Sequence, residues 1–68
     1  MTKRAINSRI AYLKRRFKRE DVDLMKLTYL EEIDELYQTL EQRGLNKTEK
    51  VQRSAWSRMA LAYWSGEA

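Results

Sequence analysis

The segment LEQRGLNKTEK, residues 40–50, contains signals for the end of one helix and the beginning of the next. Gly44 suits the left-handed C′ position that ends many helices, and Leu45 is placed to contact Leu40, as in a Schellman motif. Asn46 follows as a favoured N-cap residue. Because the connection is this short, we expect the two helices to be antiparallel neighbours.

Downstream of this turn, residues 47–65 are expected to form a helix that is closed by Gly66. Glu49 falls at position N3 and is spaced to pair with Arg53 one turn later. Apolar residues recur every three or four positions. This pattern predicts a core-facing stripe of Val51, Ala55, Met59 and Ala62, with Trp56 and Tyr63 on its shoulder.

Upstream of the turn, residues 21–43 form the second expected helix. Its apolar stripe comprises Val22, Met25, Tyr29, Ile33, Leu36 and Leu40, widened by Leu30 and Tyr37. The run TYLE, residues 28–31, also offers a capping box, with Thr28 as N-cap and Glu31 at N3. The segment therefore forms either a helix broken near Leu27–Thr28 or one long helix, and we favour the long helix.

The first expected helix covers residues 3–19, with Thr2 as its N-cap. One narrow stripe with a 4-3-4 spacing contains Ile6, Ile10, Leu13 and Phe17. The sequence therefore predicts an all-α fold, a small antiparallel three-helix bundle (about 3–19, 21–43 and 47–65) that forms a single domain over residues 1–68. Chains below about 70–80 residues bury a small core, so the prediction leaves room for a dimer.

The composition excludes several classes of function. The chain has no Cys and no His, so it lacks thiolate ligands, the commonest metal ligand and the usual general base near neutral pH. It contains no Gly-rich phosphate loop and no recognisable nucleophile–base pair. The acidic run EEIDE, residues 31–35, is interpreted as a solvated face. We therefore expect no enzyme, no cofactor and no metal site.

Hydropathy gives no sign of a membrane protein. No apolar run approaches the roughly 20 residues of a spanning helix, and no apolar signal-peptide region follows MTKR. An Arg-rich amphipathic N-terminus would also suit an anionic membrane surface or a transit peptide. Because its narrow apolar stripe is needed for the core, we instead expect a cytoplasmic protein with no membrane partner.

Charge is sorted along the chain. Residues 1–19 carry eight cations and no acid, residues 20–42 carry eight acids and only Lys26, and residues 43–68 carry five cations and two acids. Such asymmetry indicates an oriented electrostatic surface.

The first helix is the candidate binding surface for nucleic acid, either DNA or RNA. Helical projection places Arg4, Arg15, Lys18 and Arg19 opposite the apolar stripe, and Arg9, Lys14 and Arg16 beside it. Lys50 and Arg53 of the third helix are candidates to join them. The competing interpretation is that these cations complement the helix dipole and pair with acids of the second helix. That interpretation does not explain Arg4, at the unfavourable end of the helix, or the absence of acids.

Two other interpretations involve the third helix. The region around Gly44 resembles a helix-turn-helix, which would send Lys47, Lys50, Arg53 and Arg58 into the major groove, but Lys50 and Arg53 stand where that motif has buried apolar residues. Alternatively, Leu61 and Trp64 project from the core as anchors of a protein-interaction module. That module would be an adaptor, an inhibitor of another protein, or a homodimer.

Overall fold

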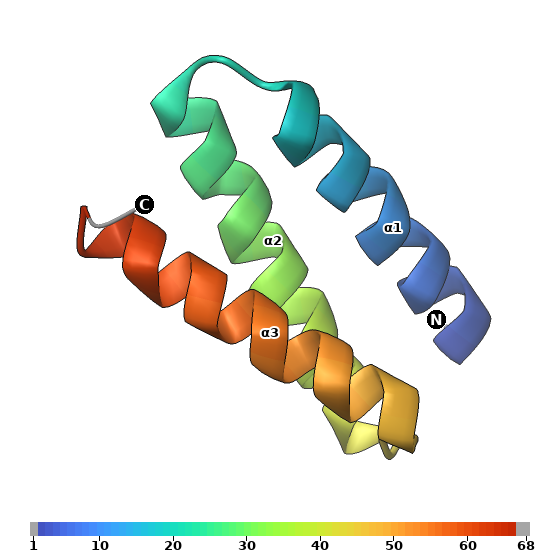
Figure 1. The fold of residues 1–68 in the computed structure, drawn as a ribbon. Helices are drawn as coiled ribbons and strands as arrows, with labels where there is room; N and C mark the ends of the chain where they lie inside the picture. Colours follow the sequence, from blue (N-terminus) through green and yellow to red (C-terminus); the bar gives the residue numbers. More distant parts are fainter. Residues whose placement is uncertain (1, 67–68) are drawn as a thin grey trace.

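A computed structural model describes residues 2–66, which form three helices and no strand in that range (Figure 1). The helices are α1 (Lys3–Arg19), α2 (Asp23–Gln42) and α3 (Lys47–Trp64). Figure 1 shows α1 and α2 side by side in opposite directions, with α3 crossing in front of α2 near the turn that joins them. The predicted all-α, antiparallel three-helix fold is confirmed.

The turn between α2 and α3 follows the sequence signals closely. Gly44 has a φ of +88°, and its N–H donates to the carbonyl of Glu41 at 3.0 Å. Asn46 and Glu49 form a reciprocal capping box: the Asn46 side chain accepts from the Glu49 N–H at 2.8 Å, and the Glu49 carboxylate accepts from the Asn46 N–H at 2.9 Å. At the other end of the chain, Thr2 caps α1 by accepting from the Ala5 N–H.

The second helix is continuous from Asp23 to Gln42. The Thr28 hydroxyl donates to the carbonyl of Leu24 one turn earlier, so it lies along the helix and does not cap a new one. The long-helix prediction is therefore confirmed. Its expected start at residue 21 is two residues early, because the Val22 N–H bonds to the Glu20 carboxylate in the connecting loop.

The core lies where the three helices converge. Its buried apolar side chains are Ile6, Ile10, Leu13, Tyr29, Leu30, Ile33, Tyr37, Leu40, Trp56 and Ala60. Phe17 and Leu36 pack against this cluster, as the stripes of α1 and α2 predicted, and Leu45 of the turn packs against it as well. Val22 and Met25 are exposed, so their predicted place in the core is wrong, because the chain enters α2 at the end of the bundle.

The predicted core face of α3 is wrong at Val51 and Ala55, whereas Met59 packs against the core as predicted. Val51 is 64% exposed and Ala55 is exposed, whereas Trp56 and Ala60 are buried. The large indole decides this rotation: the rings of Phe17 and Trp56 meet edge to face, with centroids 5.4 Å apart. Tyr63 contacts the same Phe17 ring at 6.0 Å. The residues expected on the shoulder of the stripe therefore form its centre.

The rotation of α3 also changes its ion pairs. Glu49 faces α1 and Arg53 pairs with Glu41 of α2, so the predicted Glu49–Arg53 pair is wrong. Glu49 instead accepts hydrogen bonds from Lys3 Nζ at 2.9 Å and from Asn7 Nδ2 at 2.8 Å. These bonds tie the first two turns of α1 to the first turn of α3.

Candidate functional site

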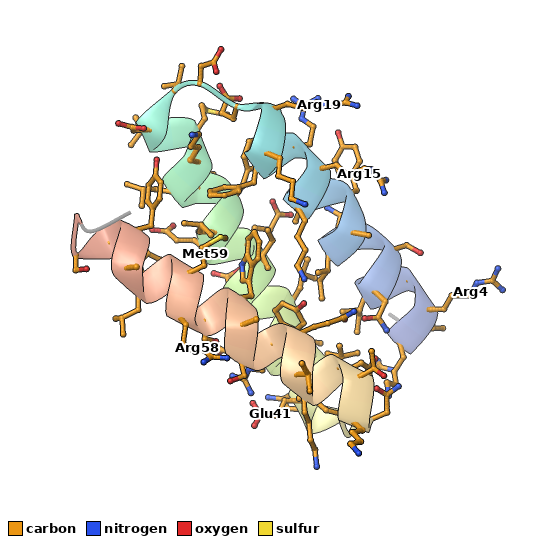
Figure 2. The ribbon with its side chains drawn as sticks, viewed as in Figure 1. Arg4, Arg15, Arg19, Glu41, Arg58 and Met59 are labelled. Carbon is orange, nitrogen blue, oxygen red and sulfur yellow. The ribbon has the colours of Figure 1, made fainter. Side chains whose placement is uncertain are left out.

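The outer face of α1 carries a row of exposed cations. We use the term cationic ridge for Arg4, Arg15, Lys18 and Arg19, all of which are exposed. Figure 2 shows Arg4, Arg15 and Arg19 extending away from α2 and α3. Within residues 2–66, none of the four forms an ion pair with a carboxylate.

The ridge follows from the register of α1. Ile6, Ile10 and Leu13 are buried, which fixes the opposite side of the helix toward solvent. Ser8 and Ala11 are exposed between Arg4 and Arg15, and because their side chains are small, they protrude little from the helix at that point. The face therefore combines exposed cationic side chains with two small exposed residues.

The cations that flank the apolar stripe have partners inside the bundle. Arg9 pairs with Glu32 of α2 at 3.1 Å. Arg16 donates to the hydroxyl of Tyr29, and this hydrogen bond raises the pKa of Arg16. Arg9 and Arg16 also lie over the ring of the exposed Tyr12, at 5.2 and 5.9 Å from its centroid. Both are therefore partly engaged in holding α1 on α2.

Lys14 is turned inward and is only half exposed. Its Nζ donates to the Tyr37 hydroxyl at 2.6 Å and lies 5.1 Å from the ring centroids of Tyr37 and Trp56. The ammonium group of this α1 residue thus lies between aromatic side chains of α2 and α3. The sequence indicated only that Lys14 borders the apolar stripe.

A hollow of about 410 Å³ lies between α1 and the start of α3. Its lining is polar or small apart from Ile10, and comprises Asn7, Ile10, Ala11, Lys14, Asn46, Thr48, Glu49 and Gln52. Glu49 is its only acid and is 5% exposed. Hydrogen bonds from the Asn46 backbone, from Asn7 and from Lys3 lower the pKa of Glu49 from 4.5 to about 2. The negative charge of this carboxylate is therefore compensated by its hydrogen-bond donors, and it adds little negative potential beside α1.

The sequence did not predict the Lys3–Asn7–Glu49 cluster. The spacing of Lys3 and Asn7 places them one turn apart on α1, which was the available signal. Their common partner could be identified only after α3 was placed.

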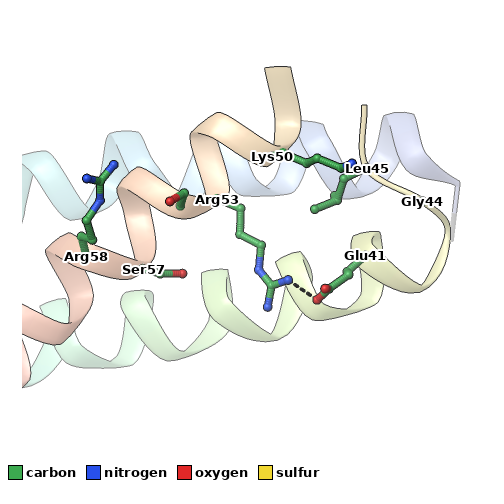
Figure 3. Close-up of a pocket in the computed structure, with 8 residues that line it drawn as sticks. Glu41, Gly44, Leu45, Lys50, Arg53, Ser57 and Arg58 are labelled. Carbon is green, nitrogen blue, oxygen red and sulfur yellow. Dashed lines mark hydrogen bonds and ion pairs between the residues drawn. The ribbon is translucent and has the colours of Figure 1, made fainter. Parts of the chain in front are cut away.

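Lys50 and Arg53 lie on a different surface from the ridge. They line a groove of about 730 Å³ between the end of α2 and α3, and no residue of α1 lines it. Figure 3 shows Arg53 extending from α3 to Glu41 on α2, with Lys50 beside Leu45. The structure therefore does not bring these two cations together with the cations of α1.

Leu61 and Trp64 are exposed at the far end of α3, by 68% and 48%. Tyr63 lies between these two residues in the sequence. Its hydroxyl donates to Asp23 at 2.9 Å, which fixes the last turn of α3 against the first turn of α2. Burial of Tyr63 is the main cause that raises its pKa, and the bond to Asp23 adds to it. Leu61 and Trp64, the predicted anchors, are therefore exposed on a helix end that this hydrogen bond fixes in place.

Comparison of the chain with protein-family models, with curated proteins and with solved structures gave no significant match. Within the described part of the chain, no helix has the length and apolar character needed to cross a membrane. Residues 2–66 also contain no group of three or more acidic side chains placed to hold a metal ion.

Proposed function

We propose that this chain is a small, non-enzymatic regulatory or accessory protein that binds duplex nucleic acid through the cationic ridge of α1. The observation that carries the proposal is that some cations of this helix have partners within the bundle and others have none among residues 2–66. Lys3, Arg9, Lys14 and Arg16 each have a partner within the bundle. The bundle therefore accounts for those four cations but gives no role to the ridge.

The helix dipole accounts for only part of the ridge. Lys18 and Arg19 lie in the last turn of α1, where cations are favourable by about 0.3–1 kcal/mol each. Arg4 is in the first turn, where a cation is unfavourable, and Arg15 lies before the last turn. Arg4 and Arg15 are thus the residues for which a ligand is the better explanation.

The dimensions of the ridge suit a phosphate backbone. Arg4 and Lys18 are separated by fourteen helical residues, or about 21 Å along the axis. Arg side chains bind phosphates in a bidentate manner, and the low surface at Ser8 and Ala11 permits close approach. Contacts of this kind position a protein on a duplex but do not read its sequence.

The test is fluorescence-anisotropy titration of labelled DNA and RNA duplexes of about 20 base pairs across a salt series. Four phosphate contacts predict a slope of about −3.6 for log K against log salt concentration on B-DNA. Arg15→Glu and Arg4→Glu should each weaken binding strongly and reduce the slope by about 1. Comparing the two duplexes tells which nucleic acid is bound.

Arg58→Glu is the matched control, because it makes the same change in net charge on an exposed residue of α3 that Figure 2 shows on the side away from α1. It should retain most of the affinity. The proposal fails if the salt dependence is flat, or if Arg15→Glu and Arg58→Glu weaken binding equally.

A protein-interaction module is the second candidate function. It is favoured by one specific observation, the exposure of Leu61 and Trp64 on a helix end that is fixed in place. Association through these residues is independent of the cationic ridge.

A further inference from the structure

Each of α2 and α3 carries a second regular stripe beside the core-facing one, and of its apolar residues Leu27 alone also packs partly against the core. On α2 the spacing is 3-4-3-4-3 and the residues are Leu24, Leu27, Glu31, Asp34, Gln38 and Glu41. On α3 the spacing is 4-3-4-3 and the residues are Lys50, Ser54, Ser57, Leu61 and Trp64. Alternation of three and four is the spacing by which helices pack along their length. We call these the outer stripes.

The two outer stripes border the same groove. Glu41 of α2 and Lys50, Ser54 and Ser57 of α3 all line it (Figure 3). At the other end, the bond from Tyr63 to Asp23 keeps the start of α2 beside the end of α3. The groove and this contact together place the stripes side by side on the surface opposite α1.

One end of this surface is apolar. At the start of α2, Leu24 is 73% exposed and Leu27 is half-buried, and Leu61 and Trp64 are exposed at the neighbouring end of α3. Large apolar side chains gathered at one place on a small protein mark an interaction site. Tyr63 and Asp23 hold the two helix ends that carry them, so the patch is preformed.

The other end of the surface is charged, and the sign differs between the helices. The α2 stripe contributes Glu31, Asp34 and Glu41, whereas the α3 stripe contributes Lys50. Arg53 also lies on the α3 side of the groove, where it pairs with Glu41 of its own chain. The surface is therefore apolar at one end and divided into an acidic and a basic half at the other.

We infer that a second copy of this chain docks on this surface. A two-fold axis parallel to the helices lays the α2 stripe of each copy over the α3 stripe of the other. The apolar ends then meet, with Leu24 and Leu27 against Leu61 and Trp64. Glu41 of one copy faces Lys50 of the other. The four helices together form an antiparallel four-helix bundle.

Charge decides between a second copy and a foreign partner. An acidic partner helix would meet Glu31 and Asp34, and a basic one would meet Lys50. Like charges placed opposite one another suppress association. A second copy is the partner that complements both halves at once.

The size of the surface indicates a reversible dimer. The α2 stripe spans seventeen residues, or about 26 Å, and two helices of about 10 Å diameter make a face of roughly 500 Å² per copy. A total near 1,000 Å² is at the lower end for specific interfaces. We therefore expect a dissociation constant in the micromolar range.

The first experiment is sedimentation velocity at concentrations from about 1 µM to about 1 mM. The wild type should pass from monomer to dimer as the concentration rises, and the emission of Trp64 should shift to the blue as it becomes buried. Leu61→Lys should remain a monomer throughout. Val51→Lys is the matched control, because Val51 is 64% exposed on another face of α3, and it should dimerise like the wild type.

The second experiment tests the arrangement itself. Lys50→Glu places two acids opposite each other in its own dimer, and Glu41→Lys places two cations opposite each other, so each variant should be monomeric alone. A mixture of the two variants restores both contacts and should form a heterodimer. A wild type that stays monomeric, or equal behaviour of Leu61→Lys and Val51→Lys, overturns the inference. Variants that dimerise alone but gain nothing on mixing overturn the two-fold arrangement.

Discussion

Enlarging a small side chain on each of two faces of α3 tests how this helix is rotated. Ala60 is 3% exposed within the core, whereas Ala55 is exposed. Ala60→Leu replaces a methyl group by an isobutyl group where the interior is already filled, and overpacking of this kind costs about 1–3 kcal/mol. Ala55→Leu makes the same change in solvent and should alter the free energy of unfolding by less than about 0.5 kcal/mol. Helix propensity changes equally in both variants and cancels in the comparison.

The assay is urea denaturation followed by the fluorescence of the buried Trp56 and by far-UV circular dichroism. In a domain of this size, 1 kcal/mol corresponds to about 4–8 °C in Tm, so Ala60→Leu should lower Tm by at least several degrees. Small cores supply about 3–5 kcal/mol in total, so the larger end of the range would unfold much of the protein. If Ala55→Leu is destabilised as much as or more than Ala60→Leu, the rotation of α3 described above is wrong.

Three further predictions concern the turn between α2 and α3 and the carboxylate beside it. Gly44→Ala should lower the free energy of unfolding by about 1–2 kcal/mol, because φ is +88° there although an added Cβ meets no atom within 4 Å; an unchanged urea midpoint would contradict this. Asn46→Ala should cost about 1 kcal/mol through loss of the α3 cap, whereas Asn46→Asp should retain the stability. Glu49 has its pKa lowered from 4.5 to about 2 in the folded state, so its contribution to stability should be complete above pH 4.5 and lost as the pH falls towards about 2. Glu49→Gln should show a weaker fall in urea midpoint over that interval than the wild type, and parallel curves would count against the cluster with Lys3.

The helix ends could be predicted from the sequence because they depend on neighbouring residues. Thr2, Gly44 and Asn46 each act within one turn of their own position, and the structure bears out all three. The stripe of α1 could also be predicted, since cations and Tyr12 occupy the large exposed positions around it and the aliphatic residues leave one possible core face.

The rotation of α3 could not be predicted in the same way. Its apolar and small residues surround the helix, so the stripe through Val51 and Ala55 and the stripe through Trp56 and Ala60 fit the sequence almost equally. The choice depends on Phe17 of α1, whose ring packs on the indole. This is long-range information that no pattern within α3 contains.

The same distinction applies to the candidate site. The outward direction of Arg4 and Arg15 follows from the α1 stripe alone, and the structure places both on the exposed face. The engagement of Arg9 with Glu32 and the inward turn of Lys14 depend on the register between helices. The sequence therefore identifies the cations of α1, but it does not indicate which of them contact other residues within the bundle.

The two proposed surfaces account together for the sorting of charge along the chain. The ridge of α1 faces away from α2 and α3 (Figure 2), and the outer stripes lie on the opposite side of the bundle. Acids placed on α1 would weaken the attraction of phosphates to the ridge, whereas acids on α2 lie where they can oppose the cations of a second copy. Because no residue is shared, a dimer formed through the outer stripes leaves both ridges exposed and pointing in opposite directions. Each chain then presents its own ridge, and dimerisation neither buries nor completes the surface proposed for nucleic acid.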